Sequence, residues 1–143
     1  MTDTLTITQS QGPVTVLHLA GKLNAQTQAM LLDTARAQKA AGTSFLLIDL
    51  GNVEFITSAG LGALHNIYRL FTPQAAMDAW EKEKHGEPYK SEYMKLASAS
   101  PSVYYVLNIA GFLQHIPIYR EVDEALESFP GRDRRHDDQK GRG

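Results

Sequence analysis

One continuous segment, residues 46–71 (LLIDLGNVEFITSAGLGALHNIYRLF), limits what this chain can fold into. The apolar run over residues 45–50 is typical of a central strand that is covered on both faces. Residues 51–54 predict a turn, and a helix is expected to begin near Ser58. Apolar positions recur along this helix at spacings of three and four: Leu61, Leu64, Tyr68 and Phe71. They predict one buried stripe that packs on a sheet.

The residues before this segment predict a pair of strands and a helix. Residues 4–8 and 14–19 are short β-branched runs separated by Gln-Gly-Pro, which indicates a hairpin-like pair. Residues 24–41 are rich in Ala, Gln, Leu and Met, with Asn24 expected as the N-cap and Gly42 just past the end. This pattern predicts a helix that connects two strands.

The residues after the segment begin with a change of composition. Residues 72–92 read TPQAAMDAWEKEKHGEPYKSE and predict an added helical element, with Pro73 in the first turn of its helix. The remaining pattern predicts a strand over residues 93–97, a helix over 100–110, a strand over 116–119 and a helix over 122–129. Strands that alternate with helices after a leading pair favour an α/β fold with a mixed sheet and helices packed against it.

Length, charge and composition limit the classes of function that this chain can have. A chain of 143 residues fits one domain, expected over residues 1–129. The absence of cysteine excludes disulfides and thiolate sites. A net charge of −2 provides no overall positive electrostatic potential that would attract nucleic acid. With no leader pattern and no membrane span, we expect a cytoplasmic protein. Residues 130–143 carry five basic and three acidic side chains and predict a disordered tail, with a basic docking arm as the alternative.

The clearest candidate site is the hydroxyl pair Thr57 and Ser58. A hydroxyl at a helix start lies beside unsatisfied backbone N–H groups, and a phosphate there also gains from the positive end of the helix dipole. A partner surface that covers a neutral serine would instead meet about −1.5 to −2 charges after phosphorylation. From these residues alone, Ser58 is either an ordinary N-cap serine or a binding site controlled by phosphorylation.

Motifs for catalysis are incomplete. The segment G-L-G-A-L-H has His65 where a dinucleotide fingerprint needs a third glycine, and Ile56 replaces the first glycine of a nucleophile elbow. Histidines at positions 18, 65, 85, 115 and 136 form neither a recognisable triad nor a zinc-like spacing. We therefore expect no catalytic residue, cofactor or metal. Trp80, Tyr89 and Tyr93 are candidates either for anchoring a partner or for packing against their own domain.

Three stretches, in this order, resemble the STAS domain, the sulphate transporter and anti-sigma factor antagonist module. LAGKLNAQT (residues 19–27) is similar to its L-x-G-x-L-D-x-x-T segment, and IDLGNVEFITSAGLGAL (residues 48–64) to its strand, D-S-[SAT]-G-L-G turn and helix. Residues 98–126 resemble its closing half through S-P-S-V, L-x-x-A-G-F, I-P-I-Y and D-E-A-L. Thr57 and Asn24 each stand where the family usually has aspartate.

The resemblance implies a non-enzymatic bacterial regulator, similar to the stand-alone anti-sigma factor antagonists. Ser58 stands at the position that a GHKL-type kinase, itself the anti-sigma factor, phosphorylates, and a phosphatase resets the switch. Thr57 is the alternative phosphosite. The partner-binding residues implied are Asn24, Thr57, Ser58, Ala59, Gly60 and Leu61. The other hypothesis is a constitutive interaction or scaffold module, in a sensory complex or a lipid-transport machine, without phosphorylation. The added element could form a homodimer contact.

Overall fold

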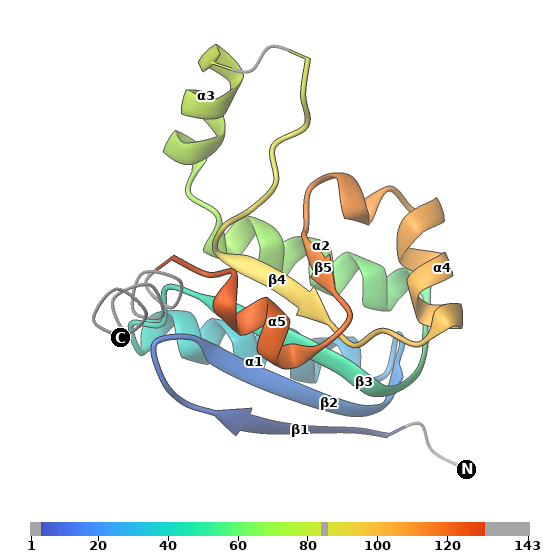
Figure 1. Ribbon diagram of the computed structural model, residues 1–143. Helices are drawn as coiled ribbons and strands as arrows, with labels where there is room; N and C mark the ends of the chain where they lie inside the picture. Colours follow the sequence, from blue (N-terminus) through green and yellow to red (C-terminus); the bar gives the residue numbers. More distant parts are fainter. Residues whose placement is uncertain (1–3, 84–85, 131–143) are drawn as a thin grey trace, which may run out of the picture.

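The computed structural model describes residues 4–83 and 86–130, and its centre is a single five-stranded sheet (Figure 1). The strands are β1 (Leu5–Ser10), β2 (Thr15–Leu23), β3 (Leu46–Ile56), β4 (Met94–Ala97) and β5 (Ile118–Tyr119). They lie in sequence order across the sheet. β1 runs antiparallel to β2, and β2 to β5 run parallel to one another. The predicted α/β class with a mixed sheet is confirmed.

Helices cover both faces of this sheet, with α5 on the face opposite α1 and α2 (Figure 1). The helices are α1 (Gln28–Ala40), α2 (Ser58–Phe71), α3 (Gln74–Glu83), α4 (Pro101–Ile109) and α5 (Val122–Glu127), with a short 3-10 helix at Phe112–Gln114. Leu17 and Leu19 of β2 point into the larger core, which also holds buried residues of α1, α2 and α4. Val16 points the other way, toward a smaller core closed by α5 and Phe129. Successive side chains of β2 therefore point to opposite faces of the sheet, as in any β-strand.

β3 is longer than the sequence suggested, and the turn predicted over residues 51–54 is wrong. These residues continue the strand because β2 continues beside them, pairing Ala20 with Asn52 and Leu23 with Ile56. Two register shifts in the pair absorb the irregularity around Gly51 and Glu54. β3 therefore runs directly into α2 with a single residue between them.

The helix predicted over residues 24–41 is present, but it begins later, and its N-cap is Thr27 rather than Asn24. Asn24 instead opens a turn, in which its backbone carbonyl accepts hydrogen bonds from the amides of Thr27 (3.2 Å) and Gln28 (2.9 Å). The sequence placed the cap one turn too early because asparagine is as well suited to that turn as to a cap.

The added element forms an arm that projects from the body of the fold, as Figure 1 shows for α3 and the segment that returns from it. Trp80 holds this arm together: its indole Nε1 donates to the backbone carbonyl of Glu87 (2.9 Å), and its ring meets Tyr89 edge-on with centroids 5.9 Å apart. These contacts lie within the element itself.

Residues 131–143, which hold nearly all of the tail predicted as disordered, are outside the described residues.

Candidate functional site

The candidate site is the junction between β3 and α2. Ile56, the last residue of β3, is buried, Thr57 is the N-cap of α2 in an extended conformation (φ −97°, ψ 177°), and Ser58 is the first helical residue. The side chain of Ser58 is exposed. The predicted start of the helix at Ser58 is confirmed, and the serine is accessible to a protein partner.

A close contact with the end of β2 fixes this junction. The backbone carbonyl of Leu23 accepts a hydrogen bond from the amide of Thr57 (3.0 Å), and the carbonyl of Thr57 accepts one from Leu61 (2.9 Å). Gly60 is buried against the same strand end, and a Cβ atom there would lie 2.5 Å from the Leu23 carbonyl oxygen and 2.8 Å from its Cγ. Only glycine lets the first turn of α2 approach β2 this closely.

The first turn of α2 has neither a side-chain cap from Thr57 nor an acidic residue. The hydroxyl of Thr57 does not cap the helix, and its Oγ1 atom is buried with no hydrogen-bond partner in the described part of the chain. The first turn contains no acidic residue. The backbone N–H groups at this end therefore receive neither a hydroxyl nor a carboxylate from these positions, and an anion beside Ser58 would meet the favourable end of the helix dipole.

Asn24, expected near the partner surface, is buried with 5% of its surface exposed. Its Oδ1 atom accepts hydrogen bonds from the amides of Gln26 (3.0 Å) and Thr27 (3.2 Å). This is the geometry of an Asx turn, which shapes the entry into α1. The side-chain oxygen of Asn24 is therefore engaged in local structure.

The predicted partner residues differ in their access to solvent. Ser58 is exposed, Thr57, Ala59 and Leu61 are half-buried, and Gly60 is buried like Asn24. The outer face of α2 continues beyond Ser58 with four exposed residues: Gly62, His65, Asn66 and Arg69. Sequence reasoning missed Gly62 as a surface feature, although its spacing of four from Ser58 places both on one side of a helix.

Comparison with known proteins identifies this arrangement. The family model described as "Mlab, STAS domain" matches residues 7–74, which include β2, β3 and α2. An anti-sigma factor antagonist from Mycobacterium paratuberculosis has the same fold, at 24% identity and a TM-score of 0.68 over 87% of this chain and 93% of that chain. Residues 7–74 therefore match the STAS domain family, and the chain as a whole has the STAS fold.

Two further structures share the STAS fold. SpoIIAA, an anti-sigma factor antagonist solved in its unphosphorylated form, is 15% identical with a TM-score of 0.61, covering 87% of this chain and 94% of that one. The phosphorylated form of SpoIIAA, a cell fate determinant of Bacillus, is 14% identical with a TM-score of 0.57, covering 87% and 97%. No curated protein matches the sequence. At these identities the structural likeness concerns the fold.

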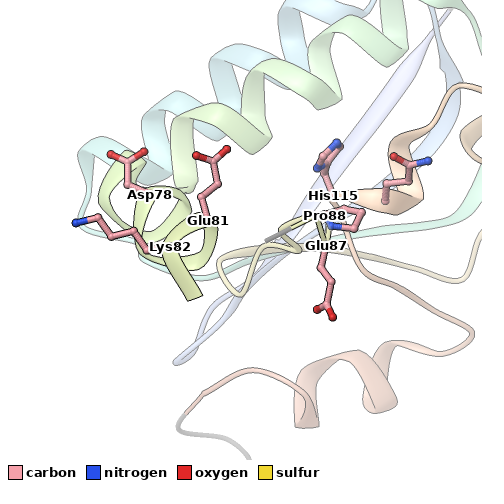
Figure 2. A pocket seen from close by; sticks show the side chains of 8 residues that line it. Asp78, Glu81, Lys82, Glu87, Pro88 and His115 are labelled. Carbon is pink, nitrogen blue, oxygen red and sulfur yellow. The ribbon is translucent and has the colours of Figure 1, made fainter. Parts of the chain in front are cut away.

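The added arm forms one side of an open cleft of about 900 Å³ (Figure 2). Asp78, Glu81 and Lys82 of α3 lie on one side, and the other side includes Pro88 and His115. Charges of both signs line the cleft.

Among residues 4–83 and 86–130, no cluster of three or more His, Asp or Glu side chains is arranged to hold a metal ion. The same residues include no helix of sufficient length and apolarity to cross a membrane.

Proposed function

We propose that this STAS domain is a regulatory binding protein of the anti-sigma factor antagonist kind, controlled by phosphorylation of Ser58. In this proposal the unmodified domain binds an anti-sigma factor that is also a GHKL-type serine kinase. Phosphorylation of Ser58 ends that binding, and a phosphatase restores it. The observation that carries the proposal is the exposed Ser58 hydroxyl at the start of α2. The shared fold with antagonists such as SpoIIAA supports the same kind of function.

Local electrostatics support a switch that acts on the partner and leaves the fold intact. A phosphate on Ser58 would lie at the positive end of α2, where the first turn provides no acidic side chain to repel it. A partner that buries the neutral serine would have to bury about −1.5 to −2 charges after modification. Burial of an unpaired charge is strongly unfavourable, so the complex would dissociate.

The geometry favours Ser58 over Thr57 as the acceptor. A kinase must bring the γ-phosphate of ATP in line with the hydroxyl oxygen, so that oxygen must be accessible. Ser58 is exposed, whereas the Oγ1 atom of Thr57 is buried. Phosphorylation of Thr57 would require the β3–α2 junction to open first.

The test is incubation of the purified protein with ATP and each GHKL-type anti-sigma kinase of the same genome, followed by mass spectrometry. We expect one phosphate on the peptide that contains Ser58 and none in Ser58→Ala. Ser102 is a matched control, because it is an exposed serine in the first turn of another helix, α4. Phosphate that appears equally on Ser58 and Ser102, or on neither residue with any kinase, would refute the proposal.

Binding separates the switch from a constitutive module. Ser58→Asp should weaken kinase binding by at least tenfold, and Ser102→Asp should leave it unchanged. Equal affinity of both variants and the wild type would favour a constitutive interaction module instead. A homodimer through the added element is not part of the proposal, because no large apolar side chain of α3 is exposed.

A further inference from the structure

Three polar side chains from three adjacent strands form a hydrogen-bonded relay on the sheet. The Oγ atom of Ser10, at the end of β1, lies 2.9 Å from Nε2 of His18 on β2. Nδ1 of the same imidazole lies 2.8 Å from Oδ2 of Asp49 on β3. Strand register brings them together: His18 pairs with Asp49 across β2 and β3, and Ser10 lies two residues beyond Thr8, the partner of His18 on β1. Residues two apart on a strand share a face.

The chemistry of the partners sets the direction of both hydrogen bonds. A carboxylate can only accept, so Nδ1–H of His18 donates to Asp49. In the neutral imidazole Nε2 is then the acceptor, and the Ser10 hydroxyl donates to it. Oδ1 of Asp49 also accepts the amide of Gly51 (2.9 Å), which holds the carboxylate in place. The imidazole is thus oriented by one neighbour and placed as a base for the other.

The order of atoms in this relay is that of a Ser-His-Asp nucleophile, base and orienting carboxylate. Sequence spacing could not predict it, because strand pairing alone joins positions 10, 18 and 49. The side chains of His18 and Asp49 are 35% and 20% exposed, and Ser10 is exposed, so a reagent can reach the hydroxyl. The relay shares no residue with the Ser58 site.

We propose that Ser10 is an activated nucleophile that accepts an acyl group from activated esters, with His18 as general base and Asp49 as the positioning residue. The Ser10 oxygen forms a bond to the acyl carbon, the bond to the leaving-group oxygen breaks, and the hydroxyl proton passes to Nε2 of His18. Fluorophosphonates probe the same chemistry: an O–P bond forms, the P–F bond breaks and fluoride leaves. General-base assistance contributes about 10²–10⁴-fold to such steps.

The test is reaction of the intact protein with a fluorophosphonate and with p-nitrophenyl acetate, with each adduct located by peptide mass spectrometry. We expect one phosphonyl or acetyl group on Ser10, at a rate about 100-fold above that of the exposed Ser102. Ser10→Ala should abolish this adduct, and His18→Gln should slow it at least tenfold. Asp49→Asn should slow it less. Thr8→Ala is the matched control. Thr8 is on the same strand as Ser10 and lies directly opposite His18 on β2, so Ser10 of this variant should be labelled at the wild-type rate.

Two outcomes would overturn the proposal. One is labelling of Ser10 no faster than Ser102, and the other is an unchanged Ser10 rate in a His18→Gln variant. Circular dichroism and urea unfolding should accompany each variant. If the three side chains only connect β1 to β3, the substitutions should lower the free energy of unfolding, and Ser10 of the wild type should show no selective labelling. Ser58→Ala should keep full reactivity at Ser10, so the result is independent of the proposed phosphorylation switch.

Discussion

Gly60 and Gly62 lie two residues apart in α2, and the same substitution should have opposite effects on them. Apart from its chain neighbours and the local helix backbone, a Cβ atom at Gly62 would meet no described atom within 4 Å, whereas one at Gly60 would meet Leu23 and Ile56 at 2.5–3.0 Å. Alanine is preferred to glycine inside a helix by up to about 1 kcal/mol. Gly62→Ala should therefore raise the free energy of unfolding by about 0.5–1 kcal/mol.

At Gly60 the steric cost exceeds this gain. The nearest obstacle is the backbone carbonyl oxygen of Leu23, which also accepts the hydrogen bond from the Thr57 amide and so cannot move without loosening the junction. Overpacking of a closed core costs about 1–3 kcal/mol, and a backbone obstacle favours the upper part of that range. After subtraction of the helix gain, Gly60→Ala should lower the free energy of unfolding by about 1–2 kcal/mol.

Urea unfolding followed by circular dichroism would measure both effects. We expect the two variants to differ by about 1.5–3 kcal/mol in the free energy of unfolding, which is about 5–10 °C in melting temperature for a domain of this size, with an unchanged dependence on urea concentration. Equal stabilities for the two variants would refute the close approach of α2 to β2. A stabilised Gly60→Ala protein would show that Leu23 does not occupy the position described.

Three more predictions concern buried or charged groups. Thr57→Val should leave the free energy of unfolding unchanged or raise it by up to about 1 kcal/mol, because it removes a buried hydroxyl that has no partner among residues 4–83 and 86–130; urea unfolding measures this. Burial lowers the pKa of Lys95, so the native state releases this proton at a lower pH than the unfolded state does. The free energy of unfolding should therefore rise with pH until the pH reaches the unfolded pKa of about 10.4. In Lys95→Met, the urea midpoint should not show this rise. Burial raises the pKa of Tyr68, so stability should fall above about pH 10, and less steeply in Tyr68→Phe.

The fold was largely predictable because its signals are local. The apolar run before Asp49, the stripe along α2 and the Ser100 cap of α4, whose hydroxyl accepts the Val103 amide at 3.3 Å, each follow from a few neighbouring residues. The extension of β3 through Gly51 was not predictable in this way, because it depends on a partner strand about thirty residues earlier in the chain. Tertiary pairing overrode a local turn signal.

The site was predictable in position and less so in detail. The start of α2 at Ser58 follows from sequence, since a hydroxyl pair precedes an apolar period of helical spacing. The buried state of Asn24 and of the Thr57 hydroxyl does not, because both depend on how closely the end of β2 meets the first turns of two helices. The Ser10 relay belongs to the same class of feature, since three strands must align before it exists.

If Ser58 is the phosphosite that we propose, the β3–α2 junction separates its structural residues from the modified one. Leu23, Thr57 and Gly60 fix the junction through a backbone hydrogen bond and a contact that no side chain can enter. Ser58 lies next to these residues, yet its side chain points to solvent on the face that continues to Gly62. A charge placed on Ser58 therefore changes the surface that a partner meets while the contacts that hold α2 against the sheet stay the same. In the proposed switch, this separation would let one covalent modification alter binding without unfolding the domain.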